Sequence, residues 1–136
     1  MFDFNQNKKC NHLFLVSLIL SFNVYGQVWE PVVESDNHTI YSYDSSSIKR
    51  EGDIVTYWEL VNHKTPLKNG KSLVLSSKTK IIQDCEKNRF KVSDMIEYDG
   101  HNGLGNMVNV TIGSETNWYP TEKDSINEVL KEWVCK

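Results

Sequence analysis

Apolar and polar residues alternate with a period of two through most of the chain between residues 39 and 112. Short alternating runs cover residues 39–43 and 107–112, whereas residues 54–62 carry apolar side chains on both faces of the expected strand. Strict alternation indicates a half-buried strand, and apolar residues on both faces indicate a strand that is covered on both sides. We therefore predict a β-sheet in which residues 54–62 form a central strand.

Two longer alternating runs, residues 73–83 and 89–98, are separated by only a few residues, and this spacing predicts a β-hairpin. If Asp84 pairs with Arg89, three further pairs follow: Ile82 with Lys91, Lys80 with Ser93, and Lys78 with Met95. One face then collects basic side chains, namely Lys78, Lys80, Arg89 and Lys91. The other face collects apolar side chains, namely Leu73, Leu75, Ile81, Phe90, Val92, Ile96 and Tyr98. We predict this register because a shift of one residue would bury the lysines.

Turn-forming residues interrupt the strand pattern at three places. Residues 63–71 contain Pro66 and an Asn-Gly pair, and residues 99–106 are rich in glycine, so both segments are predicted to be loops. Residues 43–53 are rich in side chains that bond to their own backbone, and they predict a turn or one helical turn.

After residue 120 the period of the apolar residues changes from that of a strand to that of a helix. Five apolar side chains recur on one helix face: Ile126, Val129, Leu130, Trp133 and Val134. Ser125 precedes Glu128 by one helical turn, which is a capping-box pattern, so the helix is expected to begin near Asp124 or Ser125. We predict an α+β fold, in which an antiparallel sheet of about five to six strands is packed by one C-terminal helix.

The first residues predict export from the cell. Lys8 and Lys9 precede an apolar run over residues 13–22, which is too short for a stable membrane anchor. We expect residues 1–26 to be a cleaved signal peptide and residues 27–136 to be a single domain without a transmembrane segment. Cys10 lies before the apolar run, so it is expected to leave with the signal and not to carry a lipid.

The two remaining cysteines, Cys85 and Cys135, are expected to form one disulfide bond. An exported chain reaches an oxidising compartment, and two cysteines suffice for one bridge. The chain-entropy estimate for a loop of this length is about 4 kcal/mol of stability. Lys87 and Arg89 lie near enough in sequence to favour a reactive thiolate at Cys85, but the compartment favours the bridge.

Other motifs give no case for catalysis, a metal or a cofactor. His38, His63 and His101 stand in three separate loops or strand ends, without the close spacing of a metal-binding motif. The glycine-rich residues 99–106 lead into a strand pattern, whereas a phosphate-binding loop opens a helix. Paired carboxylates occur without a shared face or a nucleophile, so we expect a protein that is not an enzyme.

Charge is distributed unevenly along the chain. The formal net charge is −3, which argues against nucleic acid as a partner. Residues 63–83 contain no acidic residue but several lysines, and further basic residues follow at Lys87, Arg89 and Lys91. Two interpretations remain open: a solvated strand face whose lysines prevent edge pairing, or a binding surface.

The order of short motifs along the chain resembles the surface-adhesin protein E family of exported bacterial proteins. The motifs are Trp29, residues 40–60 with Asp44, Ser47-Ile48 and Trp58, then Ser77-Lys78, Asp84-Cys85, residues 88–92 and Val134-Cys135. The resemblance implies an antiparallel sheet packed by a C-terminal helix, with the two cysteines joined. It also implies binding of host extracellular matrix or plasma proteins through a basic strand region, here Lys78, Lys80, Lys87, Arg89 and Lys91.

We therefore expect an adhesin-like, protein-binding domain located in the periplasm, at the cell surface or outside the cell. One alternative is a periplasmic inhibitor or protective factor that inserts residues 99–106 into the active site of a hydrolase. Another is a small-molecule carrier in which Tyr57, Trp58 and Trp118 line an apolar pocket.

Overall fold

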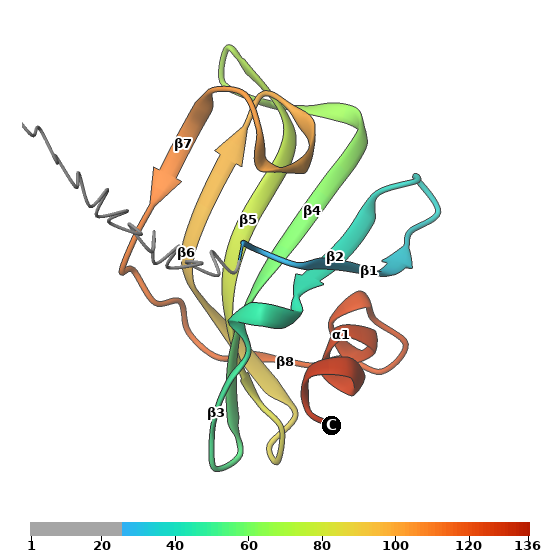
Figure 1. Cartoon of the computed structure of the whole chain (residues 1–136), viewed down its shortest axis with the longest axis vertical. Coiled ribbons are helices and arrows are strands. Elements are labelled where there is room, and N and C mark those ends of the chain that lie inside the picture. Colours follow the sequence, from blue (N-terminus) through green and yellow to red (C-terminus); the bar gives the residue numbers. More distant parts are fainter. Residues whose placement is uncertain (1–25) are drawn as a thin grey trace, which may run out of the picture.

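The computed structural model describes residues 26–136, so the predicted signal peptide lies outside the described residues apart from Gly26. One sheet has the strand order β1-β2-β4-β5-β6-β7, and the two short strands β3 and β8 pair with β4 and β6 (Figure 1). The strands are β1 Trp29–Glu34, β2 Ile40–Asp44, β3 Lys49–Glu51, β4 Ile54–Asn69, β5 Ser72–Asp84, β6 Arg89–Tyr98, β7 Met107–Thr111 and β8 Tyr119–Pro120. The helices are the short 3-10 helices η1 Ser45–Ser47 and η2 His101–Gly103, and the α-helix α1 Ile126–Val134.

This architecture confirms the predicted α+β fold, with all strand pairs antiparallel and one C-terminal helix. Strand β4 lies between β2 and β5 in the sheet, as the double-sided apolar pattern of residues 54–62 predicted. The sheet has eight strands, because the short strands β1, β3 and β8 add to those that the alternation revealed.

The predicted loop over residues 63–71 is wrong for most of its length. Strand β4 continues to Asn69, and the chain turns at Gly70, whose φ of 62° is a left-handed conformation that glycine adopts without strain. Pro66 is tolerated because it lies where the β4–β5 ladder is irregular, between Asn62 and Leu67.

The predicted β5–β6 register is correct near the turn and wrong beyond it. Asp84 pairs with Arg89 and Ile82 pairs with Lys91, as predicted. A bulge between Lys80 and Ile81 then shifts the ladder by one residue, so that the next pairs are Lys80 with Asp94 and Lys78 with Ile96. The predicted pairs with Ser93 and Met95 are therefore wrong.

The bulge is held by a segment that follows strand β7. The backbone N–H of Gly113 donates to Asp94 Oδ1 at 2.6 Å, and the N–H of Ser114 donates to the carbonyl oxygen of Ser93 at 3.1 Å. Since opposite residues of an antiparallel pair point to the same side, the shift moves Ile96 and Tyr98 onto the face that carries Lys78.

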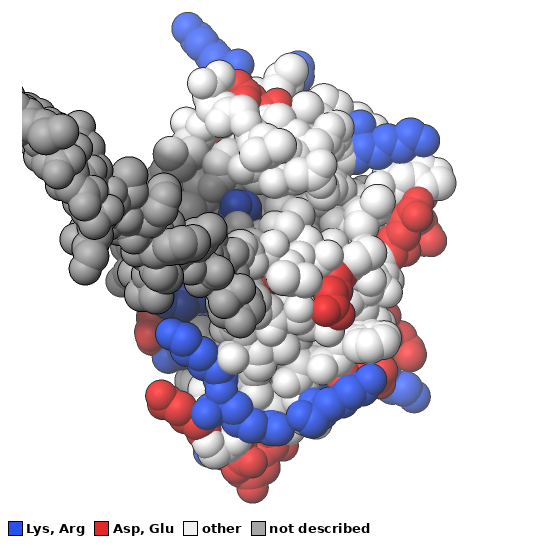
Figure 2. All heavy atoms as spheres, viewed as in Figure 1, with Lys and Arg blue, Asp and Glu red and all other residues white. Residues whose placement is uncertain are grey.

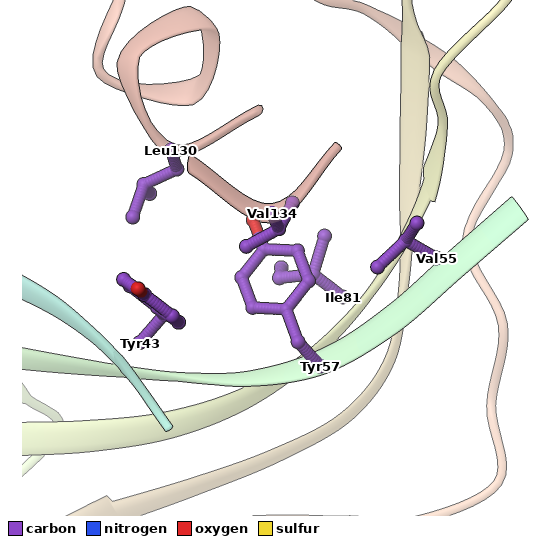
Figure 3. Close-up of a cluster of buried hydrophobic side chains, with 6 residues drawn as sticks. All are labelled: Tyr43, Val55, Tyr57, Ile81, Leu130 and Val134. Carbon is purple, nitrogen blue, oxygen red and sulfur yellow. The ribbon is translucent and has the colours of Figure 1, made fainter. Parts of the chain in front are cut away.

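The hydrophobic core lies between one face of the sheet and helix α1. Its buried side chains are Tyr43, Val55, Tyr57, Ile81, Leu130 and Val134, which point toward one another in Figure 3. Trp133, predicted to belong to the apolar stripe of the helix, is 46% exposed, and Lys136 Nζ lies 4.0 Å from its ring centre. Leu73, predicted for the core face, is also exposed at 48%.

Both ends of helix α1 are fixed as the sequence indicated. Ser125 Oγ accepts from the N–H of Glu128 at 3.1 Å, while the Glu128 carboxylate accepts from the N–H of Asp124 at 2.6 Å. The bond to Ser125 Oγ is the one that the capping-box pattern predicted, whereas the Glu128 carboxylate bonds one residue before the N-cap. At the other end, Cys135 forms the predicted disulfide with Cys85, which closes a loop of 50 residues and holds the end of the helix to the end of β5.

Candidate functional site

The candidate site is the basic face, defined as Lys78, Lys80, Lys87, Arg89 and Lys91. Lys80 lies opposite Trp58 of β4, whereas the core residues Tyr57 and Ile81 point to the other side of the sheet. Because side chains alternate along a strand, the strand members of the basic face lie on the side away from helix α1. Lys87 lies in the turn between β5 and β6 and is exposed.

Lys78 is largely enclosed by other parts of the chain. Its Nζ donates to Gln27 Oε1 at 2.8 Å and lies 5.6 Å from the ring centre of Trp29 and 5.7 Å from that of Tyr98. Gly103 of η2 packs against the lysine stem so closely that a side chain there would overlap Lys78 Cε. The segment before β1 and the 3-10 helix η2 thus cover this part of the basic face.

Lys80 lies beside a hollow of about 390 Å³ on the same side of the sheet. Its Nζ is 3.8 Å from Asp94 Oδ2, the residue that the bulge places opposite it. The hollow is bounded by the aromatic side chain of Trp58 and by charged side chains of the short strand β3, Lys49 and Glu51. Lys80 is therefore partly neutralised and partly exposed.

Arg89 and Lys91 both contact Trp118, and we call these three residues the Trp118 cluster. The guanidinium carbon of Arg89 is 4.3 Å from the indole ring centre, and Lys91 Nζ is 4.8 Å from it. Each cation also has an acidic partner: Arg89 Nε donates to Asp84 Oδ2 at 3.1 Å, and Lys91 Nζ lies 2.5 Å from Glu115 Oε2. Cation–π contacts of this kind are attractive, so they hold the ring and the two cationic side chains in place against each other.

Asp84 organises the turn that carries Lys87. Its Oδ1 accepts from the N–H groups of Glu86 at 3.2 Å and Lys87 at 3.0 Å, while Oδ2 accepts from Arg89. Burial by itself raises the pKa of Asp84, but the hydrogen bonds from Lys87 and Arg89 outweigh burial and lower it below the ordinary value. The carboxylate therefore stays ionised and fixes Lys87 and Arg89 relative to each other.

The sequence did not reveal the acidic and aromatic partners of the basic face. Asp94 and Glu115 lie outside the acid-free residues 63–83, and Trp118 follows the last long strand, so only the fold brings them to the lysines. Opposite charges are thus interleaved on the basic face. On the face turned to the viewer in Figure 2, Lys and Arg side chains also form a band beside acidic side chains at the lower tip.

The histidines, which are far apart in the sequence, come together elsewhere on the molecule. His38, His63 and His101 line one hollow of about 460 Å³. Within residues 26–136, no group of three or more His, Cys, Asp or Glu side chains is arranged to hold a metal ion. In the same part of the chain, no helix has both the length and the apolar character needed to span a membrane.

The residues named for the two alternative functions are arranged differently from each other. The glycine-rich loop is closed by Asp99, whose carboxylate accepts from the backbone N–H of Asn106 at 2.7 Å and from its Nδ2 at 2.9 Å. Tyr57 and Trp58 both border the hollow near Lys80, although the side chain of Tyr57 is 1% exposed and lies in the core. Trp118 contacts Arg89 and does not border this hollow, so the three aromatic side chains do not line one shared cavity.

Comparisons with known proteins agree on the fold. A crystal structure of Haemophilus influenzae protein E (crystal form II) matches with a TM-score of 0.63 and 19% identity, over 79% of this chain and 86% of that one. A second structure of this protein matches with a TM-score of 0.61 and 19% identity, over 79% and 83% of the chains. Protein E from non-typeable Haemophilus influenzae matches with a TM-score of 0.59 and 19% identity, over 79% and 74%.

Comparison of the sequence with protein-family profiles shows the family as well as the fold. No curated protein matches the sequence. The family profile described as surface-adhesin protein E matches residues 29–136, which include every strand and the helix of the structure. The chain therefore belongs to the surface-adhesin protein E family.

Proposed function

We propose that this protein is an exported, non-enzymatic binding domain that binds a host extracellular matrix or plasma protein through the basic face. The family is an adhesin family and not an enzyme family, which supports an exported or surface location and a protein partner. Among the residues of the face, those near the β5–β6 turn are the best suited to make the contact.

The observation that carries the proposal is the Trp118 cluster. The few residues that provide most of the binding energy at protein interfaces are enriched in Trp, Tyr and Arg, whose large side chains bury area while their polar groups still form bonds. Here Arg89 and Lys91 both contact the indole of Trp118, and Asp84 accepts hydrogen bonds from Arg89 and from the backbone of the exposed Lys87. Glu115, the partner of Lys91, is 53% exposed, so a carboxylate of a bound protein can replace it.

Lys78 and Lys80 have a different role in the proposal. Lys78 is enclosed by Gln27, Trp29 and Tyr98, so it supports the shape of the face and does not contact the partner directly. Lys80 is 38% exposed and adds positive charge that steers an acidic partner toward the cluster.

The test compares two double variants that remove the same charge from opposite ends of β5. Lys87→Gln with Lys91→Gln changes the proposed contact, whereas Lys68→Gln with Lys71→Gln changes the exposed β4–β5 hairpin. Surface plasmon resonance against immobilised matrix and plasma proteins measures binding, and thermal unfolding checks the fold. We expect the first variant to weaken binding by about tenfold or more and the second to leave it nearly unchanged.

Two results would contradict the proposal. One is a Lys87 and Lys91 variant that is folded and binds as the unmodified protein does. The other is an equal loss in both variants, which would show that net charge alone governs binding.

A second function, inhibition of a periplasmic hydrolase, is favoured by the geometry of the glycine-rich loop. The bonds between Asp99 and Asn106 close the loop, and Leu104 projects from it with 66% exposure. A pre-formed loop with one projecting apolar side chain loses little conformational entropy on entering an active site. Assays of lytic enzymes with the protein and with Leu104→Ser test this function, since only the unmodified loop should inhibit.

A further inference from the structure

A hollow of about 460 Å³ lies at the end of the sheet where three separate elements meet. The β1–β2 hairpin, the middle of β4 and η2 surround it, and Figure 1 shows the tip of that hairpin beside the upper part of β4. We call this cavity the histidine hollow. Its lining residues are Glu34, His38, Ile40, Asn62, His63, Lys64, His101 and Asn102. It lies apart from the Trp118 cluster, with which it shares no residue.

The walls of the histidine hollow are joined by hydrogen bonds. Asn62 Oδ1 accepts from the backbone N–H of Asn102 at 2.7 Å, and Asn62 Nδ2 donates to Asn102 Oδ1 at 2.9 Å. This reciprocal pair fixes η2 to β4. The hairpin wall is fixed to β4 by the ladder pair Ile40 with Asn62.

The hydrogen bonds also determine which nitrogen of two histidines carries the proton. His101 Nε2 lies 2.9 Å from the carbonyl oxygen of His63, which only accepts, so Nε2 is the N–H donor. His38 Nδ1 lies 2.6 Å from a carboxylate oxygen of Glu34, so Nδ1 is its donor. In the neutral state, the remaining nitrogens, Nδ1 of His101 and Nε2 of His38, are acceptors.

Protonation turns these acceptor nitrogens of the histidine hollow into donors. When an imidazole gains its second proton, as histidines do between about pH 7 and pH 5, the remaining nitrogen becomes a charged N–H donor. The bond of His38 to Glu34 and the bond of His101 to the His63 carbonyl use the other ring nitrogen, so a doubly protonated ring is compatible with both bonds. Protonation therefore converts acceptor nitrogens of the lining histidines into charged donors.

The charges around the histidines also become more positive in acid. At neutral pH, Glu34 of β1 and Lys64 of β4 offset each other, and Glu97 of β6 acts on His63. Burial lowers the pKa of His63, Glu97 raises it, and His101 lowers it, with a net decrease, so His63 gains its proton at a lower pH than an exposed histidine. In acid, the imidazolium charges add to Lys64 and make the hollow positive.

We propose that the histidine hollow binds a carboxylate-rich segment of a partner protein in mildly acidic solution and releases it at neutral pH. A carboxylate accepts hydrogen bonds and carries negative charge, and both match the protonated hollow. The chain as a whole has a net charge of −3, so the positive charge that attracts an acidic segment must be local, as it is at the protonated hollow. Ile40, which is 39% exposed, offers an apolar wall for the methylene groups of a glutamate.

This site is independent of the proposed function of the basic face, because the two share no residue and the basic face contains no histidine. Lys80, Arg89 and Lys91 already have acidic partners. Experiments on one site therefore leave the other in place.

The test measures binding of a fluorescein-labelled hexaglutamate peptide by fluorescence polarisation at pH 5.5 and pH 7.5, at constant ionic strength. We expect a Kd about tenfold lower at pH 5.5 than at pH 7.5, and most glutamate side chains of the peptide remain ionised at both pH values. Hexaglutamine, which has no charge, should bind at neither pH. Equal affinity for hexaglutamate at both pH values would overturn the proposal.

Three variants locate the bound peptide. The triple variant His38→Gln, His63→Gln, His101→Gln should lose the pH dependence, while Lys80→Gln with Lys91→Gln on the basic face should keep it. Retained acid-dependent binding in a folded triple variant, or its loss in the basic-face variant, would overturn the proposal. If the triple variant does not fold, the single variant His38→Gln tests the proposal in its place. The His38 side chain is 61% exposed, so its replacement should weaken binding in acid several-fold without unfolding the chain.

Discussion

The two faces of the sheet use the same strands for different purposes. On the face covered by helix α1, aromatic and aliphatic side chains such as Tyr57 and Ile81 are 1% and 4% exposed. On the opposite face, strands β5 and β6 present lysines and an arginine that pair with acids and rest on aromatic rings. Because neighbouring residues of a strand point to opposite faces, each strand contributes to both the core and the basic face.

The comparison shows where the stability of the domain originates. A fully buried apolar side chain contributes about 1.5 to 3 kcal/mol through burial, whereas an exposed ion pair contributes about 0 to 1 kcal/mol. The basic face is also not a bare surface, since residues before β1 and the helix η2 cover Lys78. We therefore expect substitutions on the helix-covered face to change unfolding free energy several times more than those on the basic face.

The largest effect is expected from Leu130→Ala in helix α1. Leu130 is 0% exposed and contacts the core beside Tyr43 and Val134, so its truncation leaves a cavity that costs about 4 kcal/mol of unfolding free energy. Urea unfolding measures the change. The matched control is Trp133→Ala on the same helix, which should cost less than about 1 kcal/mol because the ring is 46% exposed. Similar losses in both variants would mean that the helix does not bury the face assigned to it.

A smaller effect, with a definite sign, is expected for Glu59, a buried acidic residue on the helix-covered face. It lies between Tyr43 and Thr79 on the neighbouring strands and is 7% exposed. Burial raises the pKa of Glu59 from 4.5 to about 7. The folded protein therefore binds this proton more tightly than the unfolded chain does, so stability decreases as the pH rises through that interval.

Glu59→Gln should remove this pH dependence. A shift from 4.5 to about 7 corresponds to about 3 kcal/mol, so the variant should gain up to about 3 kcal/mol over the unmodified protein at pH 8 and little at pH 4. Glu86→Gln, in the exposed β5–β6 turn, is the control and should leave the curve unchanged. Parallel stability curves for the protein and Glu59→Gln between pH 4 and pH 8 would refute a proton held at this site.

The sequence predicted the features that depend on neighbouring residues along the chain. Alternation located β6, the helical period and the Ser125–Glu128 box located α1, and the count of exported cysteines gave the disulfide. Each of these is set by local periodicity or by chemistry that needs no knowledge of the fold. The error at Trp133 arises because only part of the apolar stripe is buried: Leu130 and Val134 lie in the core, whereas Trp133 is exposed and contacts Lys136.

The candidate site was less predictable, because its partners come from distant parts of the chain. The bulge at Ser93 has no local signal and depends on residues 113 and 114 returning to β6, so the pairing of Lys80 with Asp94 was missed. Trp118 could be recognised as an aromatic residue, but its position against Arg89 follows from the path of that same segment. The sequence thus identified the charged residues of the site but not the residues with which they interact.

The smallest effect is expected on the basic face itself, from Lys91→Ala. The ion pair of Lys91 with Glu115 and its contact with Trp118 are near solvent, so the loss of unfolding free energy should be about 0.5 kcal/mol, and less in high salt. Double-mutant cycles with Glu115→Ala, at low and high salt, separate the ion pair from the contact with the ring. A loss of unfolding free energy as large as that of Leu130→Ala would mean that the Trp118 cluster stabilises the fold as a second core. Its residues would then be unsuited to a binding surface, because a partner could not displace Glu115 without unfolding that end of the sheet.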